Sequence, residues 1–195
     1  MITFSIKHQE TYSRGQLILR TLFGWLYIAI PHLFLLMFIS IWGAILGFFA
    51  WWAILFTGAY PRSWFDFQVK MLRWSARLLA SLSNLTDEGA SFGLDGSSES
   101  VKLDVPYPET LSRGTLILRT LLGFFYLYIP HLFCLYFRLI GSSFVQFIAW
   151  WVVLFTGAYP ENMFNFVVGT SRWINRFQVY ASNLSDTYPP FSGKE

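Results

Sequence analysis

The sequence predicts an all-α integral membrane protein with four transmembrane helices, arranged as two tandem parallel hairpin repeats. Its 195 residues are 54% hydrophobic and 21% aromatic but only 13% charged, which is too apolar for an ordinary soluble domain. Arg14–Asp87 realigns without a gap on Arg113–Asp186, at an offset of about 99 positions and with roughly half of the residues identical. Each copy holds a run of about 38 residues, Thr21–Gly58 and Thr120–Gly157, in which Arg138 is the one charged residue.

The repeat fixes the expected domain organisation. We expect repeat 1 over residues 1–93, a linker over 94–100 and repeat 2 over 101–195, since Glu88–Ser100 is acidic and rich in Gly and Ser. Each repeat opens with strictly alternating apolar residues, which is typical of a short half-buried strand. These residues are Ile2, Phe4 and Ile6 in repeat 1 and Val101, Leu103 and Val105 in repeat 2. The two strands can pair with each other at the membrane surface.

The apolar runs are too long for one crossing. A straight helix of about 38 residues measures about 57 Å, whereas the hydrocarbon core is about 30 Å thick. A helical hairpin fits this length, with its turn near Ser40–Gly43 and Gly141–Ser143, where small residues interrupt bulky ones. Arg138 agrees with the hairpin because a guanidinium beside the turn reaches water.

A second arrangement also fits each run. The segment before Pro31 or Pro130 then forms a surface or half-inserted helix, and one long span extends from the Pro-His pair to the Leu-Phe-Thr-Gly-Ala-Tyr-Pro motif. The charges favour the hairpin. In that geometry thirteen of the fourteen Lys and Arg residues lie on one side, which the positive-inside rule makes cytoplasmic, and only Arg138 faces out. Both termini are then cytoplasmic, and a pseudo-two-fold axis along the membrane normal relates the repeats.

An amphipathic surface helix is expected after each hairpin. Gly58 and Gly157 suit helix C-caps, while Ser63 and Asn162 suit the N-caps of the next helices. Apolar and basic residues then recur at helical spacing on opposite faces. The basic stripe predicts binding to anionic lipid headgroups through Lys70, Arg73, Arg77, Arg172 and Arg176.

His32 and His131 are the candidate cofactor-binding residues. Each follows a proline in an apolar helix, and in parallel repeats the two imidazoles can face each other, which suits a haem, a quinone or a shared metal. The competing interpretation is structural. Proline frees the carbonyl four residues earlier, at Tyr27 and Tyr126, and a neighbouring imidazole can repair the kinked helix. No carboxylate or second ligand type accompanies the histidines, so a metal site is not expected.

Two tryptophan pairs complete the candidate lipid contacts. Trp51-Trp52 and Trp150-Trp151 lie about two turns before the end of their helices, where indoles anchor a helix at the interface. Alternatively, the four indoles line a cavity for an acyl chain or quinone between the repeats. No nucleophile, phosphate-binding loop or zinc motif stands out, and we expect no enzymatic activity and no nucleic-acid partner.

The combined motifs resemble a known family. Their order is Leu-Ser-Arg-Gly, Ile-Pro-His, Ala-Trp-Trp, Leu-Phe-Thr-Gly-Ala-Tyr-Pro, Phe-Asn-Phe, Arg-Trp and Tyr188-Pro189-Pro190-Phe191. This order resembles the small bacterial membrane proteins of domain of unknown function 4389. The resemblance covers both copies and implies a multi-pass protein of the bacterial cytoplasmic (inner) membrane, without implying an activity. In repeat 1 the ending is replaced by Glu88-Gly89-Ala90-Ser91-Phe92.

These observations favour a non-enzymatic membrane scaffold or accessory subunit. More aromatic side chains are present than a small bundle can bury, which indicates contacts with lipids and with other membrane subunits or further copies of the chain. Two alternatives stay open: a small transporter or channel with a path through His32 and His131, and a protein that holds haem, quinone or lipid between the repeats.

Overall fold

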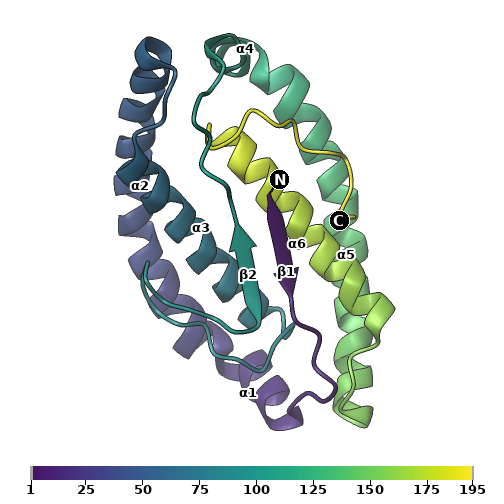
Figure 1. Ribbon diagram of the computed structural model, residues 1–195. Helices are drawn as coiled ribbons and strands as arrows, with labels where there is room; N and C mark the ends of the chain where they lie inside the picture. The colour runs from purple at the N-terminus through teal and green to yellow at the C-terminus, as the bar shows by residue number, and fades with distance from the viewer. Residues whose placement is uncertain (1, 195) are drawn as a thin grey trace.

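The computed structural model describes residues 2–194, so Met1 and Glu195, the outer ends of the expected repeats, lie outside the described residues. The same order of elements occurs twice (Figure 1). Repeat 1 consists of β1 (Thr3–Ile6), α1 (Arg14–Gly24), the π-helical segment η1 (Trp25–Ala29), α2 (Ile30–Thr57) and α3 (Arg62–Leu82). Repeat 2 consists of β2 (Val101–Asp104), α4 (Arg113–Gly123), the π-helical segment η2 (Phe124–Tyr128), α5 (Ile129–Thr156) and α6 (Glu161–Ala181).

The two predicted strands are confirmed and pair with each other. β1 and β2 form an antiparallel two-stranded sheet in which Phe4 lies opposite Leu103. These two residues occupy the same position in their repeats, so a pseudo-two-fold axis passes through this pair. Because the sheet is antiparallel, α2 and α5 run in opposite directions (Figure 1). The axis therefore runs across the long helices, and the prediction of long helices parallel to that axis is wrong.

The predicted turn inside each apolar run is also wrong. α2 continues through Ser40–Gly43, and α5 continues through Gly141–Ser143. The small residues serve close helix packing. A Cβ on Gly43 would lie 3.3 Å from the Met71 side chain of α3, and the Gln68 amide donates to the Gly43 carbonyl at 2.6 Å. The serine hydroxyls donate to carbonyls of their own helix, which lets serine stay inside a helix.

Each apolar run bends earlier, at the π-helical segment before its Pro-His pair. Pro31 and Pro130 lack the N–H that a regular α-helix needs. The backbone hydrogen bonds of the preceding residues therefore follow the i→i+5 pattern of a π-helix. The helical path nevertheless extends over 44 residues in each repeat, Arg14–Thr57 and Arg113–Thr156, and both are long and apolar enough to span a membrane. The helix boundaries follow the second arrangement, a short helix followed by one long helix.

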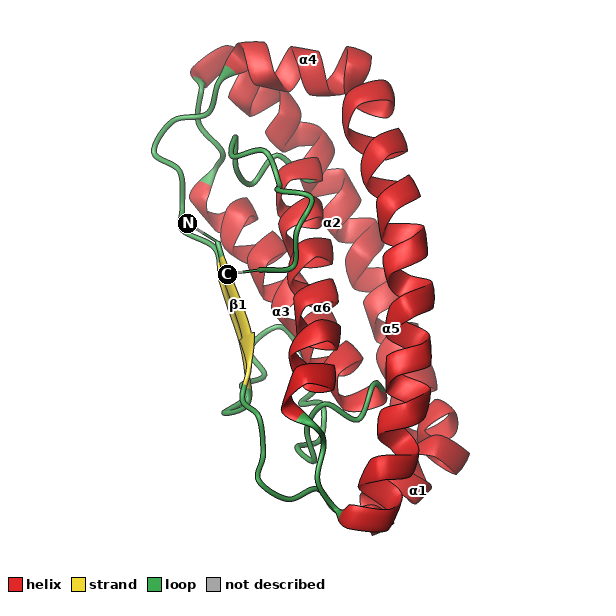
Figure 2. Ribbon diagram, turned by 90° about the vertical axis from the view of Figure 1, so that its right-hand side faces the viewer, coloured by secondary structure: helices red, strands yellow, loops and turns green. Residues whose placement is uncertain are grey.

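Four long helices form the body of the protein, as the predicted helix number requires, but their pairing differs. Each apolar helix packs against the amphipathic helix of its own repeat, α2 on α3 and α5 on α6. β1 and β2 lie on the outer side of α3 and α6, while α2 and α5 lie on the opposite side (Figure 2). α1 and α4 lie at opposite ends of the molecule (Figure 1). The layers are thus a small sheet, two amphipathic helices and two apolar helices.

The predicted glycine caps are confirmed and the predicted serine and asparagine caps are wrong. Gly58 and Gly157 both have a φ of +77°, the left-handed conformation that ends a helix. α3 and α6 begin one residue before Ser63 and Asn162, directly after Pro61 and Pro160, whose carbonyls accept the first helical hydrogen bonds.

The glycine caps are sites of reciprocal exchange between the repeats. The Gly58 carbonyl accepts the backbone N–H of Leu111 at 2.7 Å, and the Gly157 carbonyl accepts that of Tyr12 at 2.8 Å. A guanidinium reinforces each end from the other repeat, since Arg113 donates to the Phe56 carbonyl at 2.9 Å and Arg14 to the Phe155 carbonyl at 3.1 Å. Each long helix therefore ends on atoms of the other repeat.

We expect Gly58→Ala to lower the free energy of unfolding by about 1–2 kcal/mol, because an L side chain in the left-handed conformation crowds its own carbonyl. Gly15→Ala is the matched control. Gly15 lies in the first turn of α1 with only Ser13 Oγ near its Cβ position, so alanine should leave stability unchanged or raise it by up to about 1 kcal/mol. Urea unfolding in detergent micelles, followed by circular dichroism, compares the two. Equal unfolding midpoints would contradict this role of Gly58.

Candidate membrane-binding site

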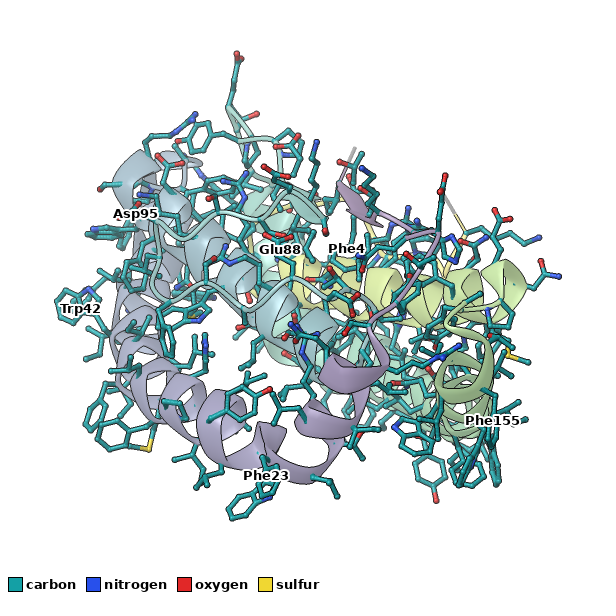
Figure 3. All side chains as sticks on the ribbon, turned by 90° about the horizontal axis from the view of Figure 1, so that it is seen from below. Phe4, Phe23, Trp42, Glu88, Asp95 and Phe155 are labelled. Carbon is teal, nitrogen blue, oxygen red and sulfur yellow. The ribbon has the colours of Figure 1, made fainter. Side chains whose placement is uncertain are left out.

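The exposed large apolar side chains gather on the two bent helices. All exposed large apolar residues of the described chain belong to the two bent helices Arg14–Thr57 and Arg113–Thr156, with the exceptions of Leu79, Phe92, Tyr188 and Phe191. Phe23 and Phe155 are 52% and 72% exposed and point away from the side where Phe4, Glu88 and Asp95 lie, while Trp42, 52% exposed, points sideways (Figure 3). We call the exposed large apolar side chains of these two bent helices the apolar face.

The opposite side is polar. Lys70 forms an ion pair with Asp95 at 2.5 Å, and Arg73 lies 3.6 Å from Asp104 of β2. Both carboxylates are exposed, at 85% and 72%. The charged partners of α3 thus lie over the sheet and the connecting loop, away from the apolar face.

Three of the five residues of the basic stripe serve the interior of the protein, whereas the side chains of Lys70 and Arg73 are 44% and 42% exposed. Arg77, Arg172 and Arg176 are buried, and each donates to backbone carbonyls. Arg172 donates to Phe4 of β1 at 2.9 Å and to Gly193 at 2.8 Å. Arg77 reaches Gly93 of the connecting loop at 2.9 Å, and Arg176 reaches Lys194 at 2.7 Å. Arg73 donates to Leu103 at 2.8 Å, so these arginines tie the sheet, the loop and the tail to α3 and α6.

The loop between the repeats is ordered by one carboxylate. The Glu88 side chain accepts the Ser98 hydroxyl at 2.8 Å, the Ser100 N–H at 3.0 Å and the Glu99 N–H at 3.2 Å. Burial raises the pKa of Glu88, but these hydrogen bonds lower it more, and the pKa lies below its ordinary value. The segment expected to be a plain linker is therefore folded against α3.

The tryptophan pairs divide into an inner and an outer member. The Trp51 indole donates to the Thr120 hydroxyl at 2.8 Å, and Trp150 donates to Thr21 at 2.8 Å, so the inner members join the repeats reciprocally. The outer members, Trp52 and Trp151, are 42% and 44% exposed and belong to the apolar face. Of the four indoles, Trp150 and Trp151 line a groove described below, whereas Trp51 and Trp52 do not line it.

His131 lies in a buried chain of hydrogen bonds. The Trp173 indole N–H donates to His131 Nδ1 at 2.9 Å, which places the imidazole proton on Nε2. That nitrogen lies 3.1 Å from the Tyr188 hydroxyl, which in turn donates to the Tyr126 carbonyl at 2.9 Å. Pro130 has no N–H to give to this carbonyl. The repair expected of the imidazole is thus made by Tyr188, which the imidazole holds in place.

His32 repeats this arrangement without the tyrosine. The Trp74 indole donates to His32 Nδ1 at 2.8 Å. Phe92 stacks on His32 at 3.7 Å between ring centroids, as Phe191 stacks on His131 at 4.0 Å. The altered ending of repeat 1 therefore keeps its phenylalanine contact.

The histidines do not form the predicted shared site. Each binds the tryptophan and phenylalanine of its own repeat, and both ring nitrogens of His131 are engaged within the protein. A bis-imidazole haem or a metal held between His32 and His131 does not fit this geometry. Within residues 2–194, no group of three or more His, Cys, Asp and Glu side chains is placed to hold a metal ion.

Two structurally central arginines at the start of the apolar runs were missed by the sequence prediction. Arg20 is buried and donates to the carbonyls of Asp87 at 2.6 Å and Glu88 at 3.1 Å, which follow α3. Arg119 holds the same position in repeat 2, donates to Asn183 Oδ1 at 2.6 Å and covers the Tyr180 ring. The occurrence of an arginine at the same position in both repeats is the sequence signal that indicates their structural importance.

Arg138 lies elsewhere than predicted. Its guanidinium donates to the Thr170 hydroxyl at 3.0 Å and covers the Phe166 ring of α6 at 4.0 Å from the centroid. It therefore points toward the amphipathic helix and does not flank a turn.

We expect His131→Leu to lower the free energy of unfolding by about 1–3 kcal/mol, because the buried Trp173 N–H loses its acceptor. The double variant His131→Leu/Trp173→Phe should recover part of this loss, since both polar partners are then removed. In repeat 1, His32→Leu, Trp74→Phe and their combination form the equivalent double-mutant cycle, at a site where no tyrosine bonds to the histidine. Thermal unfolding in detergent micelles measures the free-energy coupling between the histidine and tryptophan substitutions. If the stability losses of the two single variants simply add in the double variant, the structural role of these histidines is contradicted.

No curated protein and no solved structure matches the chain. The family model described as Domain of unknown function (DUF4389) matches residues 16–89 and 116–193, one segment in each repeat. Since these two segments cover most of the chain, the protein belongs to the DUF4389 family and contains two tandem copies of its domain.

Proposed function

We propose that this protein is a non-enzymatic membrane scaffold or accessory subunit that lies in one leaflet of the bilayer. In this proposal α2 and α5 lie in the plane of the membrane, the apolar face enters the hydrocarbon, and the sheet with its loops faces water. The observation that carries the proposal is the concentration of the exposed large apolar side chains on one side of the molecule.

The packing of α3 argues against a membrane crossing by α2. α3 runs back along α2 and carries Arg62, Asp66 and Lys70, whose side chains are 66%, 46% and 44% exposed. If α2 crossed the bilayer, these charges would lie at membrane depth, where each costs about 2.5 kcal/mol or more. With α2 in the membrane plane, the same charges stay in water.

The size of the apolar face supports stable attachment. Fully burying one large apolar side chain contributes roughly 1.5–3 kcal/mol. Even partial burial of the many side chains on this face exceeds the contribution of a single acyl anchor, which gives only marginal binding. No covalent lipid is needed for such attachment.

The proposed orientation also accounts for the charge distribution. All Lys and Arg residues then lie on one side, including Arg138, which reaches α6. By the positive-inside rule this side is the cytoplasm of a bacterial cell, and the membrane is the cytoplasmic membrane. The pseudo-two-fold axis, which runs across α2 and α5, then lies along the membrane normal. Anionic lipids, further copies of the chain or larger membrane subunits are its proposed partners.

Cysteine labelling tests the orientation. Ser63 and Asn162 are exposed equivalent positions at the starts of α3 and α6, at opposite ends of the molecule (Figure 1). We expect Ser63→Cys and Asn162→Cys, each in a Cys134→Ser background, to react with a membrane-impermeant maleimide in inverted vesicles and to be protected in spheroplasts. A membrane crossing would place the two positions on opposite sides.

Phe23→Cys is the matched control, because Phe23 lies on the apolar face and should be protected in both preparations. Labelling of Ser63→Cys and Asn162→Cys from opposite sides would overturn the proposal. Labelling of Phe23→Cys from water would show that the apolar face is not inserted.

A further inference from the structure

A groove of about 760 Å³ opens on the apolar face between the bend of repeat 1 and α5. Its volume lies within the range of about 300–1,000 Å³ that is usual for small-molecule sites. Trp25, Phe147 and Trp151 line it and are 60%, 64% and 44% exposed, so one end of the groove is continuous with the apolar face.

Polar residues also line the groove. Ser83 and Asn84, which follow α3, line it, and their side chains make no hydrogen bond within residues 2–194. These two side chains can therefore bind the polar part of a ligand.

The equivalent position in repeat 2 is partly closed. There a smaller cavity of about 420 Å³ is lined by Tyr128, whose equivalent in the groove is Ala29. The Asn183 side chain is also occupied there, because it accepts a hydrogen bond from Arg119. The two repeats have therefore diverged, and the repeat 1 groove is the roomier one.

We propose that this groove holds one membrane lipid, with an acyl chain against Trp25, Phe147 and Trp151 and the polar head toward Ser83 and Asn84. The proposal rests on the membrane insertion proposed above, since the exposed aromatic lining residues then face the hydrocarbon. The lining combines large apolar side chains with unpartnered polar ones, which suits an amphiphile in one leaflet.

Native mass spectrometry and vesicle flotation together test this lipid site. The full-length protein is reconstituted into phosphatidylethanolamine–phosphatidylglycerol vesicles, floated on a density gradient, and then released into mild detergent for the mass measurement. We expect the unchanged chain to float and to retain the mass of one phospholipid. Ala29→Tyr should float equally but lose at least tenfold in lipid occupancy, because tyrosine fills the groove as Tyr128 does in repeat 2.

Tyr128→Ala is the matched control and should keep the bound lipid, since it enlarges only the other cavity. Tyr is already accommodated at position 128, and unchanged circular dichroism of Ala29→Tyr confirms that the variant folds. If the protein floats but retains no lipid, or if Ala29→Tyr retains it fully, the lipid site is overturned while the membrane proposal stands. If the protein does not float, both proposals are overturned.

Discussion

The fold depends on the exchange of backbone hydrogen bonds at the ends of its two longest helices. The left-handed glycine after each of these helices leaves a carbonyl that its own repeat does not bind, and the opposite repeat supplies the N–H from Leu111 or Tyr12. Arg113 and Arg14 each add a donor to the carbonyl two residues earlier, at Phe56 and Phe155. Since the exchange is reciprocal, neither long helix is complete at its C-terminal end without the other repeat.

This constraint produces the two-sided character of the molecule. The exchange holds α2 and α5 in opposite directions, and both lie on the side of α3 and α6 that faces away from the sheet, where they carry the apolar face. The basic residues of α3 and α6 then lie in the interior and on the side of the sheet, away from the apolar face. There Arg77 binds a carbonyl of the loop, and Arg172 binds carbonyls of β1 and the tail. The same arginines that suggested a lipid surface thus keep the polar layer closed.

Part of this arrangement can be predicted from sequence because some patterns have one physical meaning. Alternation around Phe4 gave the strands, and glycine before Ala-Tyr-Pro gave the helix ends. Other patterns have two meanings. Gly43 can form a turn or allow close packing, and only the position of α3 decides between them. Likewise, the spacing of Arg172 is the same for a solvated stripe and for a buried set of donors, so contacts distant in sequence decide its role.

The pairing of Phe4 with Leu103 has a further consequence for how the protein assembles. Two equivalent residues meet on the axis, as they do in the interface of a symmetric homodimer. The chain is therefore equivalent to a dimer whose subunits are joined covalently, and its internal association is independent of protein concentration. Joining the halves also removes the demand that they be identical. Ala29 and Tyr128 can then differ, which a symmetric pair of identical subunits does not permit.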